Sequence, residues 1–139
     1  MINRINELLE GNKSFAFETT LSSKTHKKKI LKAKKQGYTI TILFFWLNNI
    51  ELAKERVKIR VQEGGHNIPE NVIERRYIKG IINLFENYLS IVDSALIFDN
   101  SFGKHELIAQ KFGEEDIIVS NEGKFHKLKE FYDKKRKTT

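Results

Sequence analysis

The stretch Y-T-I-T-I-L-F-F-W-L, from Tyr38 to Leu47, decides the fold. Its second half, from Leu43 onward, is apolar at every position, so both faces of a strand formed there would be buried. That pattern is typical of a parallel sheet whose two faces are covered by helices. We therefore predict a strand of an α/β sheet over this stretch.

Two further elements are predicted before this strand. The segment S-F-A-F-E-T (Ser14–Thr19) is aromatic and apolar before it turns polar, which favours a short buried strand with Glu18 near its carboxyl end. Residues Ser23 to Gln36 are predicted to be helical. An earlier helix is indicated by apolar residues at helical spacing, namely Ile2, Ile5, Leu8 and Leu9. The sequence thus opens inside a helix, which favours a domain truncated at its N-terminus.

The rest of the chain continues the alternation of helices and strands. Asn49 is a suitable cap for a helix that ends at Gly64-Gly65, and Pro69 is suited to the first turn of a long helix. The predicted elements that follow are a helix to Tyr88, a buried strand at Ser94–Asp99, a hairpin of Glu106–Phe112 and Asp116–Ser120, and a helix from Glu122 to Lys135. We predict one domain over residues 1–139, with a parallel sheet, right-handed crossovers and a C-terminal hairpin and helix.

Composition sets limits on the function. The 139 residues are 40% hydrophobic, enough for a core, and contain no cysteine, which excludes disulfides and thiolate metal sites. The longest apolar run, Ile42 to Leu47, is too short to cross a bilayer, so we expect a soluble, cytoplasmic protein. The net charge of +7 suits an anionic partner, but much of the excess lies in lysine runs typical of solvated helix faces.

The predicted sheet selects candidate site residues before any family is considered. Ligands of open parallel sheets bind beyond the carboxyl ends of the strands. Polar residues follow all three predicted strands there: Glu18, Thr19 and Thr20, then Asn48 and Asn49, then Asp99, Asn100 and Ser101. Glu18 can hold a substrate hydroxyl or accept its proton. Alternatively, it caps the helix that begins near Ser23 or pairs with a lysine.

Two pairs of arginines form the second candidate group. Arg56 and Arg60 lie four residues apart on one helical face, and Arg75 and Arg76 lie on the next helix, beyond Gly64-Gly65-His66. Guanidinium groups placed over a transferred phosphate neutralise the charge of its transition state, and glycines suit a mobile lid. The plain alternative is that all four arginines face solvent. The four histidines show no metal-ligand spacing.

Several of these segments together resemble the zeta-toxin-like P-loop kinases. The match runs in order from Ile2 to Ser101, and its most specific part is Gly-Gly-His followed by Ile-Pro and the paired arginines. The residues that carry it are Phe15-Ala16-Phe17-Glu18-Thr19-Thr20-Leu21-Ser22, Gly37-Tyr38, Phe44-Phe45-Trp46-Leu47, Arg56, Arg60-Val61, Gly64-Gly65-His66, Ile68-Pro69, Arg75-Arg76 and Asp99-Asn100-Ser101.

The resemblance implies an ATP- and Mg²⁺-dependent phosphotransferase with UDP-N-acetylglucosamine or a related acceptor. Glu18, Thr19 and Thr20 would then bind the acceptor. Arg60 and either Arg75 or Arg76 would contact the transferred phosphate. Arg56, Gly64, Gly65 and His66 would belong to the lid, and Asn100 would lie toward the adenine.

The sequence departs from the family in one respect. It contains no G-x-x-x-x-G-K-[ST] loop to hold the phosphates of ATP, and no residue matches the catalytic aspartate of the family. The resemblance therefore implies a three-layer parallel sheet of P-loop kinase type, truncated at its N-terminus. The missing strand would leave a gap of about 9.5 Å, twice the usual strand spacing, between Ser14–Thr19 and Tyr38–Leu47. We expect the chain alone to bind ATP weakly or not at all.

Three hypotheses follow for the function. In the first, the chain is a fragment of a zeta-toxin-like kinase domain, inactive alone. In the second, it is a non-catalytic remnant that binds an antitoxin, or a second copy of itself, through an open sheet edge. In the third, it is a basic nucleic-acid-binding module, which only the net charge supports. The sequence leaves the phosphate acceptor and the oligomeric state open.

Overall fold

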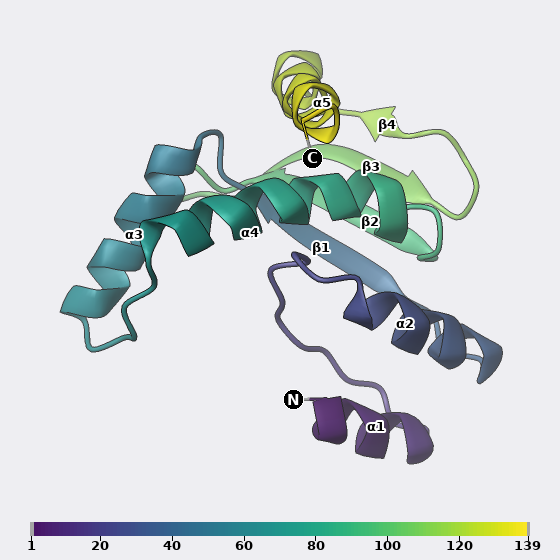
Figure 1. Ribbon diagram of the computed structural model, residues 1–139. Coiled ribbons are helices and arrows are strands. Elements are labelled where there is room, and N and C mark those ends of the chain that lie inside the picture. Colours follow the sequence, from purple (N-terminus) through teal and green to yellow (C-terminus); the bar gives the residue numbers. More distant parts are fainter. Residues whose placement is uncertain (1, 139) are drawn as a thin grey trace.

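A computed structural model of the chain describes residues 2–138. Within them, five α-helices accompany a four-stranded mixed sheet (Figure 1). The elements in chain order are α1 (Ile2–Glu10), α2 (Thr25–Lys35), β1 (Thr41–Trp46), α3 (Ile50–Gln62), α4 (Glu70–Asn83), the π-helix η1 (Leu84–Tyr88), β2 (Ser94–Asp99), β3 (Glu106–Phe112), β4 (Ile118–Val119) and α5 (Glu122–Arg136). None of the described helices has the length and apolar composition needed to cross a membrane.

The strand order of the sheet is β1-β2-β3-β4. Strand β1 pairs parallel with β2 in a register that places Thr41 opposite Ser94 and Trp46 opposite Asp99. Both later pairings, β2 with β3 and β3 with β4, are antiparallel. The predicted parallel pairing is therefore confirmed for β1 and β2, but the sheet as a whole is mixed. The C-terminal hairpin is confirmed, but it joins the edge of the same sheet and makes the sheet mixed.

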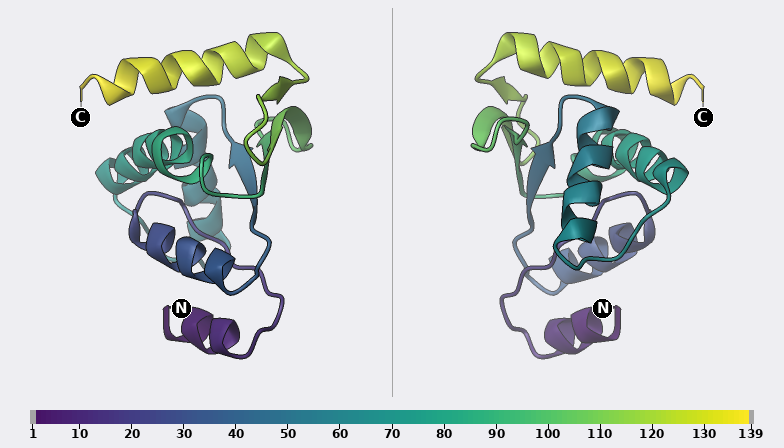
Figure 2. Two further views of the ribbon diagram at one scale, coloured as in Figure 1. Left: turned by 90° about the vertical axis from the view of Figure 1, so that its right-hand side faces the viewer. Right: turned by 90° about the vertical axis from the view of Figure 1, so that its left-hand side faces the viewer.

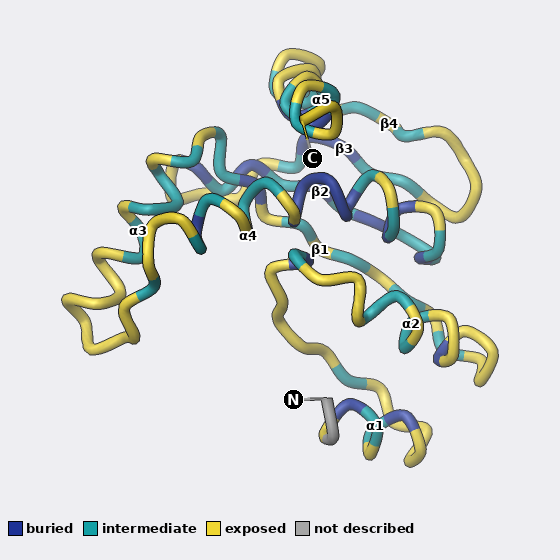
Figure 3. Tube along the Cα trace, in the orientation of Figure 1, coloured by how far each residue is buried: buried dark blue, intermediate teal, exposed yellow. Residues whose placement is uncertain are grey.

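The predicted strand at Ser14–Thr19 does not form. Residues 14–20 make an irregular loop that is exposed over most of its length (Figure 3). The aromatic residues that suggested a buried strand pack locally instead: Phe15 contacts Tyr38, and Phe17 contacts the ring of His26. With no third strand beyond β1, the predicted gap inside the sheet is absent from the described residues, and β1 is an edge strand.

The helices cover one face of the sheet, so the molecule has two layers and not the expected three (Figures 1 and 2). Alternate residues of β1, such as Ile42, Phe44 and Trp46, point into the core with α4, η1 and α5. The residues between them point to the open face, where Leu43 is 53% exposed and Phe45 is 45% exposed. A continuous apolar run indicates a strand but does not show which of its faces is covered.

The other elements agree with the sequence. Asn49 caps α3 as predicted, because its side chain accepts a hydrogen bond from the backbone N–H of Leu52 at 2.7 Å. The long helix forms but continues as a π-helix from Leu84. Helices α3 and α4 are joined by Lys54, whose ammonium lies 2.8 Å from the carboxylate of Glu74.

Candidate functional site

The segment from Glu18 to Thr20 lies in the loop between α1 and α2. Glu18 is exposed, so its carboxylate is open to a ligand. Thr19 accepts a hydrogen bond on Oγ1 from the backbone N–H of Leu21 at 3.3 Å, and the hydroxyls of Thr20 and Ser22 lie 2.7 Å apart. Such short-range bonds hold a loop in a turn without regular secondary structure.

The end of this loop is fixed to α4 and η1. The side chain of Asn83 donates to the carbonyl of Leu21 at 2.7 Å, and the hydroxyl of Tyr88 donates to the carbonyl of Ser23 at 2.6 Å. The carbonyl oxygen of Thr20 lies so close to α4 that a Cβ at Gly80 would be only 2.6 Å from it. Three contacts from one helical segment therefore determine where the loop runs.

Leu21 adopts a backbone conformation that leucine rarely takes. Its φ is +57°, in the left-handed region, and its side chain is 7% exposed within the core. A left-handed conformation costs a residue with a Cβ about 1–2 kcal/mol, and it persists only where the surroundings enforce it. Here the buried side chain and the Asn83 hydrogen bond do so. Backbone strain of this kind clusters at functional sites, which favours Glu18–Thr20 as a binding segment.

Among the predicted lid and cofactor residues, the structure brings Arg56 and Asn100 together. A guanidinium nitrogen of Arg56 donates to the carbonyl of Asn100 at 2.5 Å, and the N–H of Asn100 donates to the carbonyl of Trp46 at 2.8 Å. These two bonds connect α3 with the carboxyl ends of both parallel strands. The expectation that polar residues after all three predicted strands line one edge is thus confirmed only for the residues after β1 and β2, because Glu18–Thr20 follow no strand.

The remaining predicted residues are exposed. Arg60, Arg75, Arg76 and His66 make no side-chain hydrogen bond or ion pair within residues 2–138, so their role at a phosphate stays a prediction. The two glycines before His66 have a visible structural role. Gly64 has a φ of +99°, and the N–H of the next glycine donates to the carbonyl of Arg60 at 2.7 Å, which closes the end of α3.

The carboxyl edge of the sheet holds a buried carboxylate, Asp99. It accepts hydrogen bonds from the hydroxyl of Ser101 at 2.5 Å and from that residue's N–H at 2.9 Å, and the ammonium of Lys124 lies 2.8 Å away. Burial raises the pKa of Asp99, but the bonds from Lys124 and Ser101 outweigh burial, and its pKa is lowered below 3.8. Asp99 is therefore a charged anchor for α5 at neutral pH.

This edge does not fit the triphosphate of ATP or a Mg²⁺ ion. Most of its polar groups are already used, since Asp99 binds Ser101 and Lys124, the side chain of Asn49 caps α3, and the N–H of Asn48 donates to Ser101 at 2.9 Å. In the part of the chain that the structure describes, no three His, Asp or Glu side chains are grouped to hold a metal ion. The described residues of this edge thus offer no ready-made cluster of acidic ligands for Mg²⁺.

Sequence reasoning missed three residues that position the Glu18 loop: Gly80, Asn83 and Tyr88. Their partners lie about sixty residues earlier in the chain, so no local pattern connects them. One signal was available. A glycine inside a long, otherwise regular helix often marks the close approach of another backbone, and Gly80 is such a glycine.

Comparison with known proteins gives one family. Residues 3–112 match the family model described as Zeta toxin. An uncharacterized protein of Haemophilus influenzae is 33% identical over 63 residues, which are 45% of this chain and 45% of that protein. The chain thus matches less than half the length of that relative, and no solved structure gives a significant match. Because the family model spans most of the sequence, the chain belongs to the zeta toxin family.

Proposed function

We propose that this chain supplies the acceptor-binding loop and the arginine-bearing helices of an ATP-dependent phosphotransferase of zeta-toxin type. The proposed acceptor is UDP-N-acetylglucosamine or a related sugar nucleotide. The observation that carries the proposal is the strained, anchored loop at Glu18–Leu21 in a member of this family. A loop that is held in place before the ligand arrives binds at a lower entropic cost.

The proposed roles of Glu18 and of the arginines at the phosphate follow from residue chemistry, and the others follow from the family resemblance. The carboxylate of Glu18 accepts a hydrogen bond from an acceptor hydroxyl and can take its proton as that oxygen attacks phosphorus. Thr19 and Thr20 fix the loop beside it. Arg60, with Arg75 or Arg76, neutralises the charge that develops on the transferred phosphoryl group, a role worth about 10³-fold or more in rate in related chemistry. Arg56, Gly64, Gly65 and His66 form the lid, and Asn100 lies toward the adenine.

ATP and Mg²⁺ supply the phosphoryl group and part of the charge neutralisation in this family. Because most polar groups of the described edge already have partners, we assign this chain no step on the triphosphate of the nucleotide. Its proposed contribution is binding of the acceptor and of the transferred phosphate. We expect a titration with ATP and Mg²⁺ to show little binding to the chain alone.

The first test is a calorimetric titration of the full chain with UDP-N-acetylglucosamine. We expect saturable binding that the substitution Glu18→Gln weakens by about tenfold or more, since a hydrogen bond to a charged group contributes about 1.5–3 kcal/mol. Glu10→Gln is the matched control, because Glu10 is an exposed acid at the end of α1. It should leave the affinity unchanged.

A second titration tests the arginines. An acceptor that already carries the extra phosphate should bind more tightly than the acceptor itself, and Arg60→Ala should remove that difference while leaving the affinity for the acceptor intact. A folded chain that shows no saturable binding of either compound at several millimolar would contradict the proposal.

A further inference from the structure

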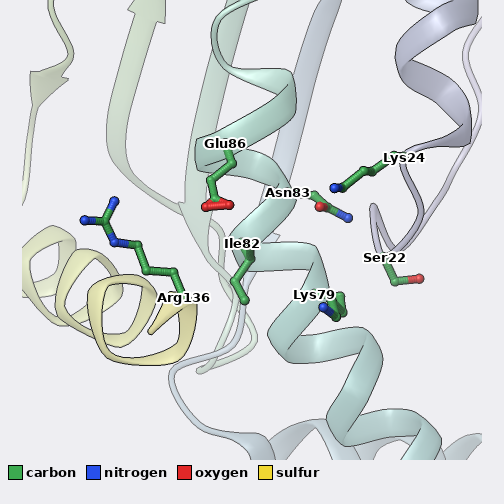
Figure 4. Close-up of a pocket in the computed structure, with 7 residues that line it drawn as sticks. All are labelled: Ser22, Lys24, Lys79, Ile82, Asn83, Glu86 and Arg136. Atoms are coloured by element: carbon green, nitrogen blue, oxygen red, sulfur yellow. The ribbon is translucent and has the colours of Figure 1, made fainter. Parts of the chain in front are cut away.

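A cavity on the helical face lies outside the residues proposed above to bind the acceptor, the phosphate or the adenine. It has a volume of about 440 Å³ and is bounded by the start of α2, the α4–η1 segment and the end of α5 (Figure 4). Its lining residues are Ser22, Lys24, Lys79, Ile82, Asn83, Glu86 and Arg136. A volume of this size is in the range of sites for small molecules, about 300–1,000 Å³.

The floor of the cavity is one stripe of a single helical segment. Lys79, Ile82, Asn83 and Glu86 lie at spacings of three, four and seven residues, so their side chains project from the same side. The α-helix changes to the π-helix Leu84–Tyr88 within this stripe. This π-helical turn ends the helical segment and carries Glu86 at the end of the stripe.

The charges around the cavity are not balanced. Three cations and one carboxylate line it. Glu86 is engaged on the α5 side, where it accepts a hydrogen bond from the hydroxyl of Tyr132 at 3.3 Å while Arg136 packs over the same tyrosine ring at 5.6 Å. On the other side, Lys24 and Lys79 make no ion pair or hydrogen bond through their ammonium groups within residues 2–138. Two positive charges therefore remain uncompensated.

The N-terminal end of α2 adds to this positive potential. Lys24 occupies the N-cap position, and the first turn of the helix contains no acidic residue. A helix N-terminus carries a partial positive charge that an acidic residue usually offsets. Here the N-cap position holds Lys24 instead of an acidic residue, so the start of α2 strengthens the attraction for an anion beside Lys24.

We infer that this cavity binds the phosphate group of a small phosphorylated compound. A phosphate dianion matches two unpaired ammonium groups in charge and accepts hydrogen bonds from both. Ser22 lines the same cavity. The site is separate from the arginines of α3 and α4, but Ser22 is hydrogen-bonded to Thr20, so a bound phosphate lies next to the anchored acceptor loop.

The test is a titration followed by two-dimensional NMR of the amide groups of the full chain. The probes are inorganic phosphate, uridine monophosphate and, as the uncharged reference, uridine. We expect phosphate and the nucleotide to shift the amides of Ser22, Lys24 and Lys79 saturably, and uridine to have no effect. Tighter binding of the nucleotide would identify a phosphate ester as the ligand, and equal affinity would identify the phosphate group alone.

Substitution of the two lysines distinguishes phosphate binding in this cavity from the general attraction of anions to a basic protein. The double variant Lys24→Met/Lys79→Met should weaken phosphate binding at least tenfold. The control Lys28→Met/Lys58→Met removes the same charge from exposed lysines of α2 and α3 and should change the affinity less than twofold. Equal weakening by both variants, or shifts that do not saturate, would overturn the inference. The same spectra show whether each variant is folded, and Glu18→Gln should leave phosphate binding intact.

Discussion

Replacement of Ser101 by alanine is expected to lower the free energy of unfolding by about 2–4 kcal/mol at pH 7. The Ser101 hydroxyl donates to the buried carboxylate of Asp99 at 2.5 Å and accepts from the backbone N–H of Asn48 at 2.9 Å. Without this hydroxyl, the carboxylate of Asp99 and the backbone N–H of Asn48 each lose a hydrogen-bond partner. The link between the ends of β1 and β2 is lost with them. Urea unfolding monitored by the fluorescence of Trp46, the single tryptophan, measures the loss.

The loss of unfolding free energy caused by Ser101→Ala should be smaller at acid pH than at pH 7. The pKa of Asp99 is lowered in the folded chain, so its ionisation stabilises the fold above pH 3.8, and that stability is lost as the pH falls through its lower, folded-state pKa. Because Ser101 provides part of this lowering, the wild type should lose more stability than Ser101→Ala on acidification. Ser90→Ala, at an exposed serine, is the control and should change the stability by less than about 0.5 kcal/mol at either pH. A defect equal to that of the control at pH 7 would contradict the role assigned to Ser101.

Local sequence patterns were enough to predict the elements whose apolar residues follow a regular pattern. The strand at Tyr38–Leu47, the cap at Asn49 and the strand at Ser94–Asp99 depend on alternation, capping chemistry and length, all of which are local. The segment Ser14–Thr19 has the same composition as a strand, but a strand also needs a neighbour with which to exchange hydrogen bonds. Its aromatic residues found other contacts on Tyr38 and His26, and its backbone remained outside the sheet.

The candidate site likewise combines features that local sequence patterns predict with contacts between residues far apart in the sequence. The rule that ligands meet the carboxyl ends of parallel strands selected Asn100, helical spacing selected Arg56, and the structure joins the two. It does not reveal the contacts that fix Leu21, because these depend on how α4 packs against a loop far away in sequence. Likewise, the cavity beside Lys24 and Lys79 exists only once α2, α4 and α5 are folded together. No spacing of residues in the sequence predicts that these three helices pack together.

Replacement of Gly80 by alanine should destabilise the chain by about 1–3 kcal/mol, the reverse of its usual effect in a helix. In the middle of a helix, alanine is normally more stable than glycine by about 1 kcal/mol. At this position a Cβ would lie 2.6 Å from the carbonyl oxygen of Thr20, which belongs to the backbone and cannot rotate away. The loop or the helix must therefore shift, and overpacking of this kind costs about 1–3 kcal/mol. Thermal and urea unfolding give the sign and the size of the change.

The control for Gly80→Ala is Gly123→Ala, in the first turn of α5. A Cβ there would meet one side-chain atom at the ordinary distance of 3.8 Å, so this variant should be as stable as the wild type or more stable by up to about 1 kcal/mol. Only Gly80→Ala should displace the loop, because the carbonyl that its Cβ would meet belongs to Thr20. Thr20 lies between Glu18 and the strained Leu21. We therefore expect Gly80→Ala to shift the amide signals of Glu18–Ser22 and to weaken acceptor binding about as much as Glu18→Gln does. If Gly80→Ala stabilises the chain as Gly123→Ala does, the loop is not held against α4, and the preorganisation on which acceptor binding depends is absent.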